Sequence, residues 1–446
     1  MKSRNSERRS GAKLAILGAA LVAVLATPLA GSAALSNGNF VIRAVDQSGE
    51  IFGMKGNPTA PEAGGGETTP PAPDLSQVAT FKLNTELCTK PGVAFSTTLP
   101  PTATVNWGDG SPVVDAMPGV NLHPYETPGT YTVTIKGEVP AFGVINSFDT
   151  SACFISMDSW GEKMNTVDAS NMFQNMTNLL SVPAKLPATV TSTYSMFNTA
   201  TKFNQDISGW DMSRVTNTNL MFRGALNFNQ DISDWDVSNV TNMASMFRGA
   251  QRFNQDISDW DVSKVTNFSS MFESTVDFDQ PLAGWDMTSA TDLSLMFKTS
   301  GSFNQDLSSW SLPNVTTMAS MFEAAKAYNT PINWPTTAKV TTLSKMFYGS
   351  VLFDKSISMD MSKVTTTQQM FYTAKAFNQD ISQWSVPSLR TISQMFYGAT
   401  LFNQDLSKWQ ISSTATHSQF VYSSAMQRLS WIECDPKLPH GWRCSQ

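Results

Sequence analysis

The chain has 446 residues, of which 15% are charged, and its formal net charge is −6 at pH 7. This balance excludes a nucleic-acid partner, because such binding depends on clustered Lys and Arg that neutralise phosphates. The length exceeds that of one ordinary domain unless a repeat array extends it.

Residues 1–34 are predicted to be a signal peptide. A basic stretch, MKSRNSERRSGAK, precedes the apolar run LAILGAALVAVLATPLA and the small residues GSAA, as in cleaved secretory signals. An uncleaved membrane anchor is the alternative, since the run is near the minimum length that crosses a bilayer. We expect cleavage near Leu35, giving a protein without a transmembrane segment that is secreted or held on the cell surface.

Export permits disulfide bonds. The four cysteines allow three pairings, and proximity in the sequence favours Cys88 with Cys153 and Cys434 with Cys444. Their spacing matches no zinc-site pattern. Structural bridges are therefore expected, without a metal cofactor.

Three segments precede the repeats. Residues 35–54 form a short strand-rich lead, and residues 55–74 are a linker of mainly Gly, Pro and Thr with little to bury. In residues 75–150, short runs rich in Val, Thr and aromatic residues alternate with Pro and Gly, as in a small β-sandwich.

Two motifs in this third segment, VNWGDGS (105–111) and HPYETPGTYTVTI (123–135), resemble the signature of polycystic-kidney-disease (PKD) domains, which are immunoglobulin-like modules. The resemblance implies that Trp107 lies in the core and that the residues around Asp109 make a tight turn. A turn role for Asp109 is favoured over a ligand role, since Asp-Gly pairs are typical of turns. Three residues of the following strand are expected to face inward: Tyr131, Val133 and Ile135.

Beyond residue 150 the sequence repeats every 24 or 25 residues, as a recurring Met-Phe pair shows. A fixed period of this length predicts a solenoid, in which each unit covers the apolar face of the next. We expect about eleven coils over residues 151–427 and a C-terminal cap over 428–446. The Met positions are 172, 196, 221, 246, 271, 296, 321, 346, 370 and 395, and Gln419-Phe420 continues the series.

One unit, residues 228–250, predicts the secondary structure of a coil. Its first apolar residues have nearly the L-x-x-L-x-L spacing of leucine-rich repeats, whose L-x-L is a short strand: Ile232, Trp235, Val237 and Val240. Its next apolar residues continue from Val240 at helical spacing: Met243, Met246 and Phe247. The predicted fold class is an α+β, leucine-rich-repeat-like solenoid with one short strand and one short helix per coil, after the β-sandwich.

Each unit also repeats one Phe, as at Phe228 and Phe253, and one Trp, as at Trp235 and Trp260; these positions are called the Phe column and the Trp column. An Asn recurs between the two columns, with Asp at two coils. Because buried polar groups need partners, we expect these side chains to bond the turn backbone of neighbouring coils rather than a ligand. The column is Asn204, Asn229, Asn254, Asp279, Asn304, Asn329, Asp354, Asn378 and Asn403.

The consensus F-N-Q-D-I-S-x-W-D-V-S-x-V-T-N-M-x-x-M-F-x-G-A closely resembles the BspA-like leucine-rich-repeat surface proteins of bacteria, over about residues 150–427. The resemblance implies an exported binding protein that adheres to host or matrix proteins or to other cells. No anchor motif is seen at the C-terminus, which leaves the mode of attachment open. An inert structural spacer is the alternative function.

Catalysis is not expected. Pairs such as Asp234 and Asp236 have the residue type that a glycosidase uses. However, the same Asp recurs in coil after coil, whereas an active site needs one unique constellation. A carbohydrate-active enzyme is therefore the third interpretation.

Two exposed surfaces are candidate binding sites for a protein or glycan outside the cell. Carboxylates on consecutive coils could bind a basic protein surface or loosely held Ca²⁺; the alternative is that each bonds the next coil's backbone or is solvated. These residues are Asp211, Asp236, Asp261 and Asp286. An aromatic patch is the second candidate, because exposed Tyr is common at recognition sites; the alternative is packing against the C-terminal cap. Its residues are Tyr328, Trp334, Tyr348, Tyr372 and Tyr397.

Overall fold

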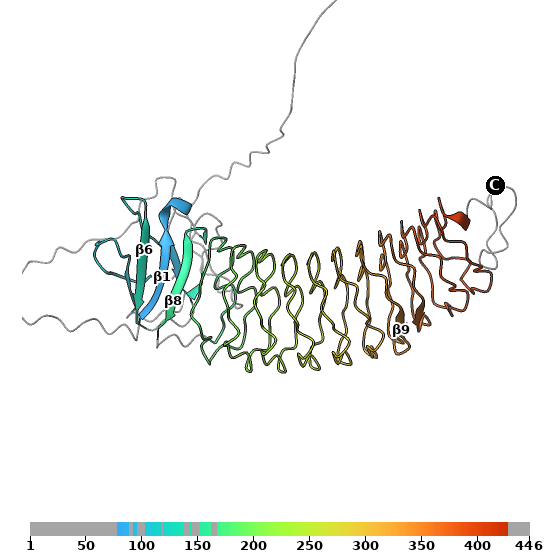
Figure 1. The fold of residues 1–446 in the computed structure, drawn as a ribbon, viewed down its shortest axis with the longest axis horizontal. Coiled ribbons are helices and arrows are strands. Elements are labelled where there is room, and N and C mark those ends of the chain that lie inside the picture. The colour runs from blue at the N-terminus through green and yellow to red at the C-terminus, as the bar shows by residue number, and fades with distance from the viewer. Residues whose placement is uncertain are drawn as a thin grey trace, which may run out of the picture. The chain divides into compact units, whose positions relative to one another are not determined.

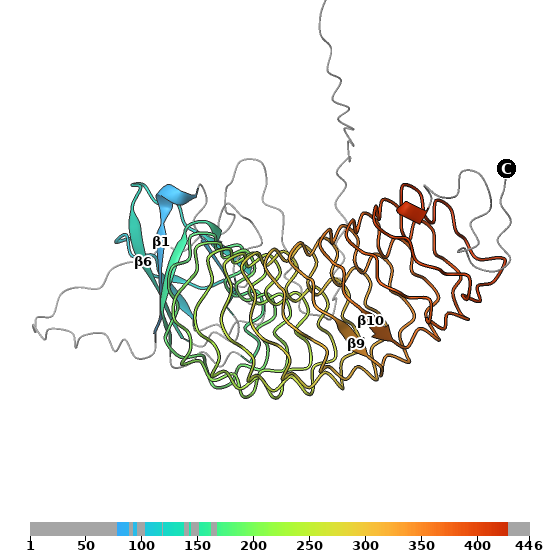
Figure 2. The same ribbon diagram turned by 45° about the vertical axis from the view of Figure 1, so that its right-hand side comes forward.

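A computed structural model describes the repeats and most of the segment before them. The described residues are 78–88, 92–95, 103–117, 119–137, 142–143, 151–161 and 167–426. The expected signal peptide, lead and linker lie outside them, as do the C-terminal cap and its Cys434 and Cys444. Figure 1 shows the coils of residues 167–426 stacked side by side, and Figure 2 shows the same row turned.

The described part of residues 78–160 forms two antiparallel β-sheets, with strand orders β4-β3-β6-β1-β8 and β5-β2-β7. A short 3-10 helix, η2 (Thr85–Leu87), follows the first strand. The strands are β1 (Val78–Asn84), β2 (Gly92–Phe95), β3 (Thr104–Asn106), β4 (Val114–Asp115), β5 (Gly119–Leu122), β6 (Thr130–Lys136), β7 (Phe142–Gly143) and β8 (Phe154–Trp160).

The larger sheet has an apolar core that follows from alternation along its strands. In β6, Val133 and Ile135 are buried while the residues between and around them are not, because successive side chains of a strand point to opposite faces. Trp107 is also buried, whereas Tyr131 is half-buried and stacks on Tyr125 with ring centroids 4.2 Å apart.

A tight turn follows β3. Gly108 and Gly110 have φ of 79° and 85°, a region that favours glycine because it lacks a Cβ. The Asp109 carboxylate accepts a hydrogen bond from the Ser111 N–H (3.0 Å), and its second oxygen lies 2.6 Å from His123 Nε2. Asp109 therefore fastens the turn to the segment before β6.

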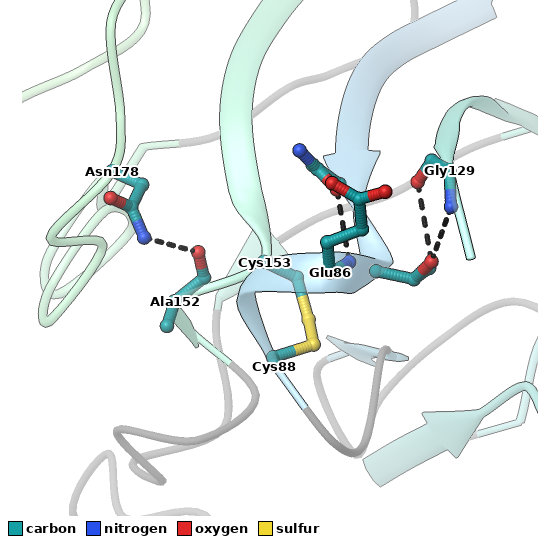
Figure 3. Close-up of a disulfide and its surroundings, with 8 residues drawn as sticks. Glu86, Cys88, Gly129, Ala152, Cys153 and Asn178 are labelled. Atoms are coloured by element: carbon teal, nitrogen blue, oxygen red, sulfur yellow. Dashed lines mark hydrogen bonds between the residues drawn. A yellow bond between two sulfur atoms is a disulfide. The ribbon is translucent and has the colours of Figure 1, made fainter.

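Strand β8 belongs to both the sheet and the array. It pairs with β1 in the sheet, and its Met157 N–H donates to the Ser181 carbonyl of the first coil (2.9 Å). A disulfide joins Cys88 to Cys153, next to β8, with Cα atoms 5.2 Å apart. Beside this disulfide the Asn178 amide donates to the Ala152 carbonyl (2.9 Å), as Figure 3 shows. The sheet is thus bonded directly to the first coil.

The prediction of a helix in each coil is wrong. No residue between 167 and 424 is α-helical. The Met246 N–H donates three residues back to Met243 O (3.1 Å), whereas the Phe247 N–H donates to Met271 O of the next coil (3.0 Å). Because backbone donors alternate between the same coil and the next, the i→i−4 bonds of an α-helix cannot form.

Two residues per coil have left-handed backbone, and they close the turns that replace the helix. In one coil these are Ser245 (φ 56°) and Gly249 (φ 70°), four residues apart. The first of these positions is never Gly in this chain. It is occupied by Asn171, Ser195, Leu220, Ser245, Ser270, Leu295, Ser320, Lys345, Gln369, Gln394 and Gln419.

In most of the described coils the predicted strand is not formed. Trp235 and Val237 are buried and Asp236 is exposed, as expected of alternation, but turn bonds close the backbone on either side: Trp235 N–H to Ile232 O (3.2 Å) and Val240 N–H to Val237 O (2.9 Å). The described array has one strand pair, β9 (Ile332–Trp334) parallel to β10 (Ile357–Met359). Elsewhere a ladder of single parallel β-bridges joins the coils.

Stacked phenylalanines fill the interior of the array. In the coils from Met196 to Met395, the Phe of the Met-Phe pair stacks on the aromatic residue six positions later, which is Phe except at Tyr328; Phe247 and Phe253 have centroids 3.9 Å apart. Each also stacks on its equivalent in the next coil, for example Phe247 on Phe272 at 5.8 Å. Since no coil could bury these rings alone, the stacked neighbours hold each coil in place.

Polar groups near the core are paired between coils. The Trp235 Nε1–H donates to the Ile207 carbonyl of the preceding coil (3.1 Å), and the other tryptophans of the column repeat this bond. In the Asn column, the Asn229 Oδ1 accepts from the Asn254 N–H (2.9 Å). Only the acceptor oxygen is needed for this bond, so Asp279 and Asp354 replace Asn without breaking the ladder.

The last coil departs by one residue from the expected register. The left-handed residues Gln394 and Gln419 are equivalent, so Phe420 takes the place of Met395 and Val421 that of Phe396. The sequence Gln419-Phe420 is therefore not the eleventh Met-Phe pair. Coils are numbered below from the one that contains Met172 to the one that contains Phe420.

Candidate binding surfaces

The predicted acidic stripe consists of exposed carboxylates that are held by their own coil. The Asp236 Oδ1 accepts a hydrogen bond from the Ser238 N–H, two residues on, at 3.0 Å. The same bond recurs at the other three: Asp211, Asp261 and Asp286. Each carboxylate thus caps a turn of its own coil rather than bonding the next coil's backbone.

A second column of capping carboxylates was missed by the sequence prediction. Asp231 accepts from the Ser233 N–H (3.0 Å), and Asp206 and Asp256 make the same bond. The D-x-S spacing that both columns share was the available signal. Residues 201–300 contain 13 Asp and Glu against 7 Lys and Arg, so these coils are strongly acidic. The seven carboxylates named in these two columns are together called the acidic columns below.

The caps keep several of these carboxyl groups ionised. Hydrogen bonds from the Ser213 hydroxyl and N–H lower the pKa of Asp211, and bonds from Ser263 do the same for Asp261. The pKa of Asp231 is lowered in the same way, first by the Ser233 N–H. A hydrogen bond to the charged form favours that form.

These lowered pKa values predict how stability depends on pH. A carboxyl whose pKa is lower in the folded chain stabilises it above the unfolded pKa of about 4 and loses that contribution as pH falls. We expect the urea midpoint to fall between about pH 5 and pH 3. Asn at positions 211, 231 and 261 keeps the acceptor oxygen but does not titrate, so this variant should show a smaller fall. An equal fall in both proteins would contradict the assignment.

The predicted aromatic patch is divided between the interior and the surface. Tyr328 and Trp334 are fully buried: Tyr328 stacks between Phe303 and Phe353 in the Phe column, and Trp334 stacks on Trp310. Their placement in the patch was therefore wrong, because they occupy interior positions of the repeat.

The remaining tyrosines form a stacked row on the surface. Ring centroids are 4.7 Å apart for Tyr348 and Tyr372 and 4.6 Å apart for Tyr372 and Tyr397, with nearly parallel planes. Tyr422, which is 45% exposed, stacks on Tyr397 at 5.1 Å and extends the row. It was missed because the last coil was read one residue out of register.

In the earlier coils, the same surface position is charged. Arg248 binds the Glu273 carboxylate through Nε (3.0 Å) and Nη2 (3.2 Å), and Lys298 Nζ lies 3.1 Å from Glu323. This position therefore changes along the array from ion pairs to stacked tyrosines.

Neither a cluster of metal ligands nor a membrane-spanning helix is found in the part of the chain that the structure describes. There, no group of three or more His, Cys, Asp or Glu residues could hold a metal ion. No helix among those residues is long and apolar enough to cross a membrane.

The comparisons with known proteins concern the array. Three of its segments match the family described as Mycoplasma protein of unknown function, DUF285, over residues 167–274, 228–334 and 330–431. No curated protein and no solved structure matches the chain. Because the matched segments together cover more than half of the 446 residues, the chain belongs to this DUF285 family of repeat proteins.

Proposed function

We propose that the chain is an exported, non-catalytic binding protein, an adhesin, whose acidic columns bind a basic surface of a protein outside the cell. The observation that carries the proposal is the regularity of these columns. Consecutive coils present exposed carboxylates, each oriented by a backbone N–H of its own turn, as in Asp211, Asp236 and Asp261.

Fixed carboxylates suit electrostatic recognition. Because the caps hold one oxygen of each side chain, less side-chain entropy is lost when a cation binds the other oxygen. A surface of one sign also steers a partner of the opposite sign and speeds its association. Binding by this surface should weaken as salt is added, since exposed charges are screened.

Two features of the sequence support export and adhesion. The first 34 residues have the pattern of a cleaved signal peptide, and the repeat consensus resembles the BspA-like surface proteins. A structural spacer is the second candidate, which the Phe and Trp columns favour, because they make the array regular along its length, with Tyr328 and Met359 as substitutions.

Binding of the purified chain to a panel of extracellular-matrix and serum proteins, with and without Ca²⁺ and at several salt concentrations, tests the proposal. The informative variant replaces Asp211, Asp236, Asp261 and Asp286 by Asn, which removes four charges but keeps the capping oxygens. We expect its affinity for basic proteins to fall by about tenfold or more, because several charges that attract the partner are removed together.

The matched control replaces Asp380 and Asp405, which cap turns in later coils in the same way. Asn at these two positions should leave binding unchanged. Undiminished binding by the fourfold variant would contradict the proposal. A wild-type chain that binds nothing on the panel would favour the spacer.

A further inference from the structure

In one surface column, the charged and aromatic residues are ordered so that the column complements a second copy of itself that runs in the opposite direction. It consists of the residue after the Met-Phe pair in each of coils 3 to 10 and is called the outer column. Its members occupy one backbone position, since the carbonyl of each from Arg248 onward accepts an N–H from the coil before, as in Gly249 N–H to Glu273 O (2.7 Å). In order they are Arg223, Arg248, Glu273, Lys298, Glu323, Tyr348, Tyr372 and Tyr397.

We propose that this column is the interface between two copies of the chain, packed antiparallel about a two-fold axis between coils 6 and 7. In an isologous contact of this kind, each residue meets its counterpart at equal distance on the other side of the axis. The resulting contacts are Arg223 with Tyr397, Arg248 with Tyr372, Glu273 with Tyr348, and Lys298 with Glu323, each occurring twice.

A guanidinium is attracted to a tyrosine ring, which favours the two Arg–Tyr contacts. Glu273 is only 8% exposed and both its oxygens bind Arg248 of its own chain, so Tyr348 would pack at the edge of this ion pair, where its hydroxyl can donate to the carboxylate. At the axis, Lys298 and Glu323 of one copy already lie 3.1 Å apart. The second copy would complete an alternating set of four charges there.

Like charges exclude the competing arrangements. A parallel, in-register pair would place each of Arg223, Arg248 and Glu273 against itself. An antiparallel pair centred on coil 6 would place Lys298 against itself, and one centred on coil 7 would do the same to Glu323. The overall charge also favours the antiparallel arrangement, because it brings the acidic residues 201–300 of one copy near residues 301–426 of the other. The second range contains 8 Lys and Arg against 6 Asp and Glu.

The neighbouring columns are also complementary in size. At the first left-handed position, a small residue would face a long one in three of the four contacts, and the fourth would be Leu220 with Gln394. The three are Ser245 with Gln369, Ser270 with Lys345, and Ser320 with Leu295. Three residues beyond the outer column, Val276 and Val351, which are 44% and 37% exposed, would face each other. Burial of these side chains adds apolar area to the charged contacts.

The column is long enough for a specific interface. Eight coils at the usual strand spacing of about 4.8 Å extend for roughly 35 Å. With its flanking columns, this surface is of the order of the 800 Å² per partner that standard interfaces bury.

Sedimentation velocity of the purified chain tests the proposal when the charges of the two residues at the axis are exchanged. Protein concentrations from about 1 to 100 µM cover the weak end of the affinities that interfaces of this size give. The wild-type chain should form dimers. Lys298→Glu alone and Glu323→Lys alone should each raise the dimer dissociation constant by about tenfold or more, because each places like charges at two symmetric contacts.

The double exchange, K298E with E323K, should restore the wild-type constant. The exposed residue Lys264, which bonds Asn239 in another column, provides the matched control; Lys264→Glu should not change the constant. Circular dichroism verifies that every variant is folded.

Two outcomes would overturn the proposal. One is a wild-type chain that remains monomeric over the whole range. The other is a double exchange that fails to restore dimers, since an axis between coils 5 and 6 would pair Lys298 with Glu273 and could not be rescued in this way. Binding to other proteins is measured separately, so neither outcome depends on the proposed adhesion.

Discussion

Replacement of Phe247 by Ala should lower the free energy of unfolding of the array by about 3 to 5 kcal/mol, the usual range for a buried phenylalanine. Phe247 is fully buried and its ring stacks on Phe222, Phe253 and Phe272. The truncation would leave a cavity that opens onto two neighbouring coils. Urea unfolding followed by tryptophan fluorescence measures the loss.

Two variants serve as controls for this prediction. Phe247→Leu fills most of the cavity and should cost clearly less. Tyr422→Ala removes a half-exposed ring at the end of the row and should change stability by only about 0.5 kcal/mol. A loss below about 1 kcal/mol for Phe247→Ala would show that coils repack around the cavity, contrary to the close packing inferred here.

Gly108→Ala should strongly destabilise the larger sheet. An added Cβ would lie 2.2 Å from the Thr132 carbonyl oxygen. Thr132 lies inside β6, where it pairs with Lys82 of β1, and the β6 residues from Thr134 onward also pair with β3. Since a backbone atom in the middle of a sheet cannot move without breaking these pairs, we expect a loss of about 3 kcal/mol or more. Hydrogen exchange of the β6 amides should report the loss.

Gly110→Ala separates the clash from the backbone strain. Gly110 has a similar φ of 85°, but no atom lies within 4 Å of the Cβ that would be added there. Only the strain of the left-handed region remains, which costs roughly 1 to 2 kcal/mol. Equal losses for the two variants would refute the clash with Thr132.

The period and the interior of the array could be predicted from the sequence because both are local properties of the repeat. Recurrence every 24 or 25 residues requires stacked coils, and residues such as Phe247 and Trp235 are too large and apolar to be exposed in every coil. The bond between an Asn side chain and a neighbouring coil also followed, since a recurring polar side chain near the core needs a partner.

The secondary structure of a coil could not be predicted, because an α-helix and a series of three-residue turns place apolar residues inward at the same spacing. Apolar residues at Val240, Met243, Met246 and Phe247 face inward on a helix, and they also face inward on successive three-residue turns. The deciding feature is the left-handed residue between them, which is Ser245 in one coil but Leu220 and Lys345 in others. None of these residue types marks a positive φ, so stacking rather than local preference imposes it.

The candidate surfaces were predicted in part. The exposure of Asp236 followed from its place between the buried Trp235 and Val237. Tyr328 and Trp334 stand in the Phe and Trp columns, so their repeat position predicts burial, whereas their residue types alone are equally typical of an exposed recognition surface. Tyr422 follows Tyr397 by 25 residues, so the repeat period contains the signal for it, but the Phe of Gln419-Phe420 suggests a Met-Phe pair one residue earlier.

The sharing of β8 between the sheet and the first coil has a consequence for synthesis. The first coil bonds to the edge of strand β8. Because β8 precedes the array in the chain, this edge leaves the ribosome before the first coil does. At about 5 to 20 residues per second, each further coil emerges within a few seconds of its finished neighbour. The array can therefore grow in one direction, one coil at a time, so that at most one unpaired edge is exposed to aggregation.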